Sequence, residues 1–175
     1  LLPACAGTQT CYRDLLVGQT EVDWGSLIVN NTIRAAINGA GHTFNNLAGS
    51  GINATLQGTD NSTAAGGYGI TTSGTALQFG VNAAENYGLQ VDFSAPLGVA
   101  FYIIGLKGTE ILEIQSDEPV VWFKAVAEGG GTTITGSGTT HLILDANGDS
   151  DGITGWVYVE DATELTFYYA STSGS

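Results

Sequence analysis

Basic residues are scarce in this chain: its 175 residues include 4 lysines and arginines against 17 aspartates and glutamates, for a net charge of −13. The four basic positions are spread along the sequence, so no patch can neutralise a run of phosphates. We therefore expect no nucleic-acid binding. The same shortage argues against attachment to anionic lipid, and no apolar run approaches the ~18 residues that a membrane span needs.

Charged residues of both signs are few, at 12% of the chain, where about 25% is usual. Thr, Ser, Asn and Gly supply the polarity instead, so we expect a surface of hydroxyl and amide groups. Apolar residues make up 43% and occur in many short runs, which excludes a disordered chain. A chain of this length buries roughly 70% of its unfolded surface. We expect a single domain at residues 24–175, preceded by an N-terminal arm at residues 1–23.

Cysteine is almost absent, and the two that occur, Cys5 and Cys11, lie close together in the arm. A disulfide between them within one chain would stabilise the fold by about 2 kcal/mol. A bond to a neighbouring chain would instead join two N-terminal segments. The spacing does not decide between these alternatives. A structural zinc site is not expected, because the two thiols have no companion His or Cys nearby.

Three features predict an extracellular protein. Residues 1–7 resemble the end of a secretory signal, and we expect cleavage just upstream of them. Acceptor patterns for N-glycosylation begin at Asn30, Asn53 and Asn61. The charge-poor surface agrees with both observations.

Short alternating or apolar runs, separated by Gly, Asn, Asp, Ser or Pro, predict about ten β-strands. They cover residues 24–33, 52–57, 75–81, 87–93, 97–106, 109–115, 119–127, 139–144, 154–160 and 164–170. No stretch keeps helical spacing for more than two turns. Strands at intervals of about ten residues predict an all-β fold, an antiparallel β-sandwich of jelly-roll or Greek-key type with an N-terminal extension.

Two of these runs, Val99–Ile104 and Val120–Phe123, are apolar on both faces of the strand. Such strands are expected to be covered on both sides. The second face is covered either by another part of the same chain or by a segment from another molecule, and the sequence leaves both open.

Residues 1–23 carry apolar side chains but no block that can fold alone. The side chains of this arm that would bind a partner are Leu15, Leu16, Val17 and Val22. In strand addition between subunits, backbone hydrogen bonds provide affinity and alternate side chains enter pockets of the partner. A detached apolar arm beside a charge-poor sandwich suits that process. The competing interpretation is an ordinary first strand that pairs with its own sheet.

In this layout the chain resembles extracellular filament subunits assembled by donor-strand complementation, such as TasA-like biofilm fibres and archaeal bundling pili. The resemblance covers the order of arm and sandwich along the whole chain. It implies a polymerising structural protein in which residues 1–23 insert into the next copy. The two cysteines depart from that pattern.

The most specific local pattern is the acidic segment 145–152, in which oxygen-bearing side chains recur at every second position. Its candidate ligands are Asp145, Asn147, Asp149 and Asp151. Calcium takes six to eight oxygen ligands, and four such groups packed this closely repel one another unless a cation binds. The sequence therefore predicts a calcium loop, although not an EF-hand, since Trp156 stands where the bidentate Glu would be. The alternative is a solvated hairpin turn.

No residue pattern predicts an enzyme: His42 and His141 lie in presumed strands, and no positional signature selects a nucleophile or a carboxylate pair. The sequence predicts a secreted, non-enzymatic subunit that self-assembles with other copies of itself into an extracellular filament or matrix, stabilised by calcium. The alternative is a calcium-assisted carbohydrate-binding module that stacks glycans on exposed aromatics, for which Trp156 and Tyr158 share one face of a strand.

Overall fold

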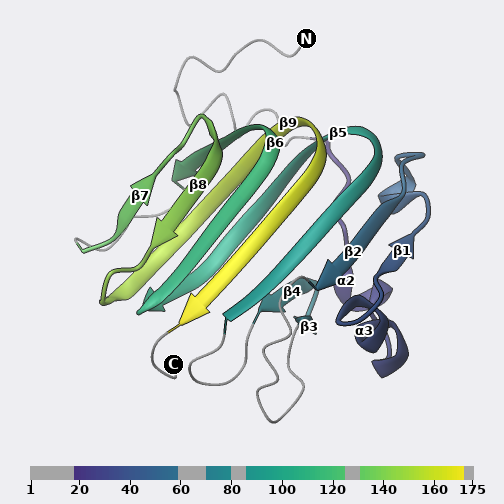
Figure 1. Cartoon of the computed structure of the whole chain (residues 1–175), viewed down its shortest axis with the longest axis horizontal. Coiled ribbons are helices and arrows are strands. Elements are labelled where there is room, and N and C mark those ends of the chain that lie inside the picture. The colour runs from purple at the N-terminus through teal and green to yellow at the C-terminus, as the bar shows by residue number, and fades with distance from the viewer. Residues whose placement is uncertain (1–17, 59–69, 80–85, 125–130, 172–175) are drawn as a thin grey trace.

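The computed structural model describes residues 18–58, 70–79, 86–124 and 131–171 (Figure 1). Two short helices come first, α2 (Trp24–Leu27) and α3 (Asn31–Ile37), and a 3-10 turn, η1 (Leu47–Gly49), follows β1. The strands are β1 (His42–Phe44), β2 (Ala54–Gly58), β3 (Ile70–Ser73), β4 (Ala76–Phe79), β5 (Asn86–Gly108), β6 (Glu110–Lys124), β7 (Thr133–Thr135), β8 (Thr139–Asp145) and β9 (Asp149–Ser171).

Within these ranges, one antiparallel sheet has the strand order β1-β2-β5-β9-β6-β8-β7, and β3 pairs with β4 in a separate hairpin. The predicted all-β, antiparallel class is therefore confirmed. The three longest strands lie at the centre of the sheet: β5 and β9 span 23 residues each, and β6 spans 15.

Each of these long strands bends near its middle, so the sheet doubles over on itself (Figure 1). The β5–β9 register shifts between Asp92 and Leu97, and the β6–β9 register shifts between Ser116 and Val120. The first layer contains residues 86–92 of β5, 164–171 of β9 and 110–116 of β6. The second layer contains residues 97–108 of β5, 149–159 of β9 and 120–124 of β6.

The bends occur at residues that interrupt a regular strand. Pro96 lies in the β5 bend and Pro119 in the β6 bend, and proline cannot donate a hydrogen bond to a neighbouring strand. The β9 bend contains Asp161, whose φ of 55° lies in the left-handed region. The interruptions predicted at these bends were correctly placed. The runs on either side of a bend, such as 87–93 and 97–106, were predicted as separate strands but are two halves of one bent strand.

The core lies between the two layers. Phe101 packs edge-on against Phe167, with ring centroids 5.2 Å apart. The two residues are not neighbours within the sheet: Phe101 is opposite Val157 in the second layer, and Phe167 is opposite Leu89 in the first. The ring contact therefore joins the second layer to the first. Fully buried side chains from both layers belong to the same core, among them Leu56, Leu89, Ile114, Leu142, Val157 and Val159.

The prediction of a strand at residues 24–33 was wrong, since this segment contains α2 and the start of α3. Both helices begin at a residue whose side chain caps the first turn. Asp23 Oδ1 accepts from the Ser26 amide at 3.0 Å, and Asn30 Oδ1 accepts from the Ile33 amide at 2.9 Å. Such caps satisfy backbone N–H groups that have no partner within the first turn of a helix. Local capping thus outweighs the β-branched composition of the segment.

Removing the Phe167 ring should loosen the contact between the layers. We expect Phe167→Ala to lower the free energy of unfolding by about 3–5 kcal/mol, the usual loss for a buried aromatic residue. The neighbouring Tyr168 is 42% exposed on the opposite face, so Tyr168→Ala is the matched control and should change stability by only about 0.5 kcal/mol. Equilibrium urea unfolding measures both, and equal losses would contradict the interlayer role of Phe167.

Candidate functional site

The acidic segment predicted to bind calcium forms the tight turn between β8 and β9. Asn147 and Gly148 occupy its corner with φ angles of 48° and 83°, the left-handed backbone that Asn-Gly adopts in two-residue hairpins. The Asp149 amide donates to the Ala146 carbonyl at 2.9 Å and closes the turn. Asp145 Oδ1 accepts from the Asn147 amide at 2.7 Å. The turn geometry therefore gives this composition a structural role of its own.

Asp149 also ties the turn to the segment before β7. Its Oδ2 accepts from the Gly131 amide at 2.9 Å, its Oδ1 accepts from the Asp151 amide at 2.7 Å, and the Asn147 side chain donates to the Gly131 carbonyl at 2.9 Å. The hydrogen bonds from Gly131 and Asp151 lower the pKa of Asp149 below its ordinary value, against a smaller opposing effect of desolvation. Backbone amides thus stabilise the charge on this carboxylate.

Calcium binding at this turn stays a prediction. Within the described ranges, no three side chains of His, Cys, Asp or Glu are grouped in a way that could hold a metal ion, so backbone carbonyls or water would have to complete a site. The predicted ligands remain Asp145, Asn147, Asp149 and Asp151.

Thermal unfolding in calcium chloride and in a chelator tests the calcium prediction. A site that binds only the folded chain raises the melting temperature when calcium is added. We expect that rise in the native chain and its loss in Asp149→Asn. An identical melting temperature in calcium and in chelator would show that hydrogen bonding is the whole role of the turn.

The predicted modification sites are described only in part. Asn30 is exposed and uses Oδ1 to cap α3, whereas a glycan would be attached at Nδ2. Asn53 is half-buried, and its Oδ1 accepts from the Asn46 amide at 3.0 Å. The other predicted positions lie outside the described residues: Asn61, Cys5 and Cys11.

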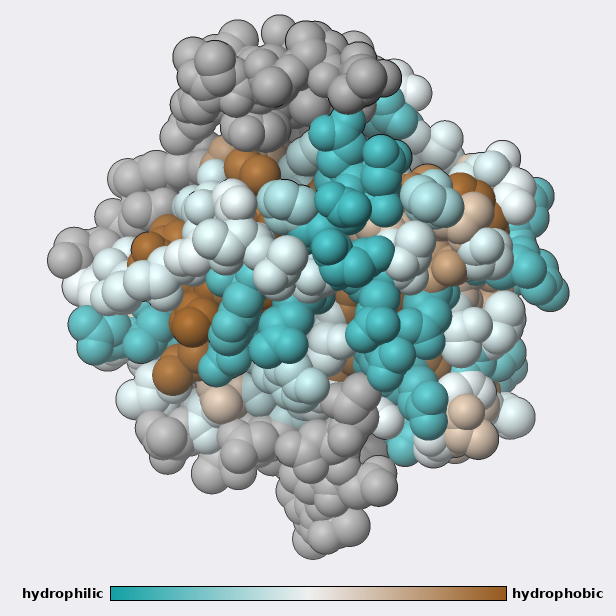
Figure 2. All heavy atoms as spheres, turned by 45° about the horizontal axis from the view of Figure 1, so that its top comes forward, coloured by the Kyte–Doolittle hydropathy of each residue, from teal (hydrophilic) through white to brown (hydrophobic). Residues whose placement is uncertain are grey.

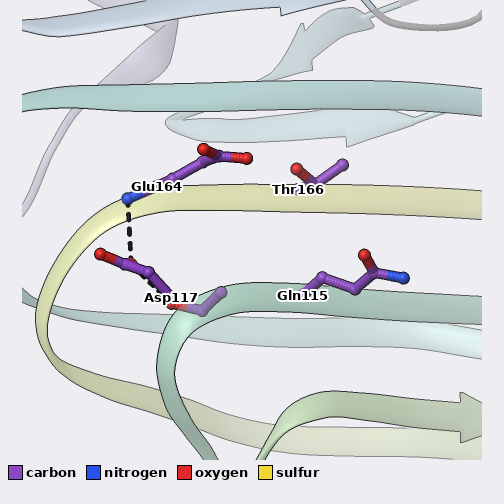
Figure 3. A pocket seen from close by; sticks show the side chains of 5 residues that line it. Gln115, Asp117, Glu164 and Thr166 are labelled. Atoms are coloured by element: carbon purple, nitrogen blue, oxygen red, sulfur yellow. Dashed lines mark hydrogen bonds between the residues drawn. The ribbon is translucent and has the colours of Figure 1, made fainter.

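A polar pocket of about 240 Å³ lies on the outer face of the first layer, beside the bends of β6 and β9 (Figure 3). Its lining consists of Gln115, Ser116, Asp117, Glu164 and Thr166. Gln115 and Thr166 are direct neighbours across the β6–β9 pair. The lining presents hydroxyl, amide and carboxylate groups without a basic or imidazole side chain. Such a lining suits a small polar ligand.

Asp117 holds the bends of β6 and β9 together. Its carboxylate accepts from the backbone amides of Thr163 and Glu164, each at 3.1 Å, and from the Thr163 hydroxyl. Desolvation acts to raise the pKa of Asp117, but the hydrogen bonds from the Thr163 hydroxyl and the two amides outweigh it and hold the pKa below its ordinary value. At neutral pH this side chain is an ionised clamp and a poor proton donor.

Polar groups continue across this face away from the pocket. Glu113 Oε2 lies 2.9 Å from His141 Nε2, and both side chains are half-exposed. In the view of Figure 2 the described surface is mostly hydrophilic or neutral, with hydrophobic residues in small groups. This agrees with the surface of hydroxyl and amide groups expected from the composition.

The second layer ends in a long edge. Along residues 97–108, β5 pairs with β9 on one side. On its other side its partner within the described ranges is β2, whose pairing stops at Phe93. The edge from Gly98 to Ile104 has no charged residue, and the backbone groups of such an edge can pair with an added strand. By contrast, the terminal strands β1 and β7 have three residues each.

The predicted arm enters the described part of the chain at residue 18. Val22 and Trp24 pack against the core of their own chain, and the Trp24 amide donates to the Thr75 carbonyl at 3.0 Å. Any segment exchanged between copies therefore ends before Val22. The remaining arm residues named above lie outside the described residues: Leu15, Leu16 and Val17.

Comparison with protein-family models, with curated proteins and with solved structures finds no match to this chain. Across the part of the chain that the structure describes, the helices are too short and too polar to span a bilayer. The roles of the turn, the pocket and the β5 edge therefore follow from their own residues. The pocket was missed from the sequence because Asp117 and Glu164 are 47 positions apart, and only the bends bring them together.

Neutralising Asp117 should loosen the two bends. We expect Asp117→Asn to lower stability at neutral pH by about 1 kcal/mol, because it weakens hydrogen bonds made to a charged acceptor. The stabilisation is complete above the unfolded-state pKa of about 3.9 and is lost as the pH falls through the lower folded-state pKa.

The difference in melting temperature between the native chain and Asp117→Asn should therefore narrow as the pH is lowered from about 6 to 2. Asp161→Asn is the matched control, since Asn tolerates the left-handed backbone of the neighbouring bend. A difference that stays constant with pH would contradict the clamp.

Proposed function

We propose that this chain is a non-enzymatic structural subunit that self-assembles outside the cell into a filament or matrix, by adding an N-terminal strand of one copy to the sheet of the next. The observation that carries the proposal is the uncharged edge of β5 from Gly98 to Ile104. Natural proteins protect long edges with charges, prolines, bulges or covering segments. Here Pro96 and Lys107 protect the two ends, and the stretch between them can accept a donor strand.

A strand added at this edge would extend the second layer in its own plane. Its backbone would bond to the β5 groups that point away from β9, and its alternate side chains would point to the core or to the outer face. Phe101 and Ile103 face the core at this edge and are only partly buried. Apolar side chains from a donor strand would complete their cover, which gives the exchange a hydrophobic component.

The proposed donor is the part of the arm before residue 18, in which Leu15 and Val17 would project to one face of the added strand and Leu16 to the other. These three precede Val22, which packs against the core of its own chain. This order of donor and acceptor is the one implied by the resemblance to TasA-like fibres and archaeal bundling pili. Cys5 and Cys11 would then pair within the arm or link neighbouring arms.

We further propose that the doubled sheet is a jelly roll, a double-layered fold of antiparallel strands. The strand order supports this topology. In the first layer the segments of β5, β9 and β6 lie in that order and are followed by β8, and in the second layer the other halves of the same three strands repeat the order. Each long strand thus contributes one half to each layer.

The small share of charged residues, 12% of the chain, supports close packing of identical copies. With a net charge of −13, contact between copies is opposed by repulsion unless it uses neutral surface. Hydroxyl and amide groups can hydrogen-bond across such contacts. Calcium at the β8–β9 turn and glycans at the predicted sites Asn30, Asn53 and Asn61 belong to the same proposal of an extracellular assembly.

A second candidate function is carbohydrate binding, because Tyr102 and Trp156 form an aromatic pair on the outer face of the second layer. Their ring centroids are 5.0 Å apart, and Tyr102 is 39% exposed. Ligand sites combine apolar contact with a few placed polar groups, whereas the flanking Ala100 and Ile104 of β5 are apolar. The structural role is therefore favoured. Binding to a glycan array that Trp156→Ala abolishes would reverse that preference.

Electron microscopy of the full chain tests the assembly. We expect ordered filaments from the native chain and single particles from Leu16→Pro, because proline removes a backbone donor that strand addition needs. The double variant Cys5→Ser with Cys11→Ser separates cross-linking from strand addition and should still form filaments. Uniform single particles from the native chain would overturn the proposal.

Hydrogen exchange then locates the acceptor in the same samples. Those amides between Gly98 and Ile104 that point away from β9 should exchange roughly tenfold more slowly in filaments than in Leu16→Pro, equivalent to about 1.4 kcal/mol of protection. Amides of the central β9 half, residues 155–159, already lie between β5 and β6 in the chain itself and serve as the control. Unchanged exchange at the β5 edge in filaments would exclude it as the acceptor.

A further inference from the structure

We infer that the polar pocket beside the bends of β6 and β9 binds a neutral oligosaccharide, one ring of which enters the pocket. Its volume of about 240 Å³ is below the roughly 300–1,000 Å³ of sites for drug-sized ligands, so it suits a single ring. The pocket lies on the outer face of the first layer (Figure 3), whereas the proposed acceptor edge of β5 belongs to the second layer. Sugar binding at this pocket is therefore a further function, and it does not rest on the proposed assembly.

The pocket forms where β6 and β9 part at their bends. The regular pairing of the two strands ends at Ser116 and resumes at Val120. The Asp117 carboxylate crosses this gap and accepts from the amides of Thr163 and Glu164. These hydrogen bonds hold the two bends together before a ligand binds, and a pre-organised site loses less conformational entropy on binding.

One residue of the lining is a buried polar group without a partner. Thr166 is only 9% exposed although it lines the pocket, and in the described part of the chain its hydroxyl has no hydrogen-bond partner. Buried hydroxyl groups are normally paired, because an unpaired one has lost its hydrogen bonds to water. A ligand in the pocket would supply the missing partner. Thr166 thus points to a ligand independently of the acidic residues around it.

Two further lining side chains are free to bind the same ligand. Gln115 is opposite Thr166 on β6, and Glu164 is two positions before Thr166 on β9, so all three project from the same face. In Figure 3 the Glu164 carboxylate extends along β9 towards Thr166. Both side chains are exposed, and among the described residues neither the Gln115 amide nor the Glu164 carboxylate has a hydrogen-bond partner. Three unengaged polar groups therefore lie next to one another.

The mixture of these groups selects a ligand that carries hydroxyl groups. The Glu164 carboxylate only accepts hydrogen bonds, whereas the Gln115 amide and the Thr166 hydroxyl both donate and accept. A sugar hydroxyl also does both, so adjacent hydroxyls of one ring can pair with all three side chains. An ammonium group has no acceptor for the Gln115 amide donors. An anion would meet two carboxylates and no basic side chain in the lining.

Tyr168 supplies an apolar surface next to these polar groups. It follows Thr166 by two positions on β9, so its side chain projects from the same face, and it is 42% exposed. Its ring offers a flat surface to the C–H groups of a sugar ring, and ligand sites combine such apolar contact with a few placed polar groups. By contrast, the aromatic pair of the second layer is flanked by Ala100 and Ile104, which are apolar.

The pocket lies in a row of polar side chains that crosses the first layer. Thr166 is opposite Gln90 of β5 on one side and Gln115 of β6 on the other. The row continues with Gln57 of β2 and His141 of β8. Neighbouring strands are about 4.8 Å apart, so a chain of sugar rings that lies across the strands meets a hydrogen-bonding side chain on each one. This row is the reason for assigning an oligosaccharide and not a single free sugar.

Isothermal titration calorimetry with neutral and charged probes tests the assignment. The protein is the full chain with Leu16→Pro, in which the proposed strand exchange cannot occur. The neutral probes are cellohexaose and mannohexaose, the anionic probe is the hexamer of galacturonate, and the cationic probe is the hexamer of glucosamine. We expect at least one neutral probe to bind, with an affinity that sodium chloride leaves unchanged because no charge pair is involved, and the galacturonate hexamer not to bind.

Thr166→Val separates ligand binding from stability. It removes the hydroxyl but keeps the shape of the side chain, so the affinity for the neutral probe should fall roughly tenfold, as expected for one lost hydrogen bond. Because the hydroxyl is unpaired in the free protein, the melting temperature should not fall. The matched control is Thr135→Val: Thr135 is exposed on β7 and follows the core residue Ile134, so it projects from the same outer face. It should change neither quantity.

Glu164→Gln distinguishes a neutral ligand from a cationic one. It keeps a hydrogen-bond acceptor but removes the charge, so a neutral probe should lose less than roughly tenfold in affinity, whereas a ligand held by its positive charge would be lost. Amide chemical shifts in the presence of the neutral probe should change at residues 115–117 and 164–168.

Four outcomes would overturn the assignment. Three concern the pocket itself: neither neutral probe binds at millimolar concentration, only the glucosamine hexamer binds, or Thr166→Val binds a neutral probe as tightly as its parent. The fourth is a loss of binding in Trp156→Ala but not in Thr166→Val, which would place the sugar on the second layer. Single particles from the native chain in microscopy would leave all these results unchanged, so sugar binding and strand exchange fail separately.

Discussion

The length of the central strands is the constraint on which the rest of this structure depends. A straight strand of 23 residues, as β5 and β9 would be, extends roughly 75 Å at about 3.3 Å per residue, too far for a domain of this size to cover. Bending each strand near its middle brings the two halves of the same sheet against each other. The Asp117 carboxylate fixes this arrangement by accepting hydrogen bonds from Thr163 and Glu164 at the β9 bend. Without the bends, Phe101 and Phe167 would not meet and there would be no enclosed core.

Doubling the sheet creates two outer faces with opposite properties. The packing inside is close: a side chain at Gly155 would place its Cβ 2.5 Å from the Trp122 ring, so the glycine is required for that ring to lie on the inner face. The outer face of the first layer is polar and carries acids such as Glu113 and Glu164. The outer face of the second layer carries Ala100, Tyr102 and Ile104 of β5 and Trp156 of β9, and there it is apolar. This difference follows from which half of each strand enters which layer.

Local patterns predicted the long strands but not the short strands β1, β3 and β7, and the pairing between distant segments could not be predicted from local patterns. Alternating runs and prolines located the strand halves and their breaks, including those at Pro96 and Pro119. The segment 24–33 was misassigned because its β-branched residues were weighed above the caps at Asp23 and Asn30. The acidic turn was recognised as a distinct feature, but its partner Gly131 was not, since only the fold brings them together. Likewise, no local signal shows that the pairing of β5 with β2 stops at Phe93.

The scarcity of charge along the β5 edge supports the proposed assembly. Most acidic domains remain apart because every approach brings like charges together, and protected edges add a second barrier. In this chain the stretch from Gly98 to Ile104 has no charged residue along its edge, which is the reason for proposing it as the acceptor of a donor strand.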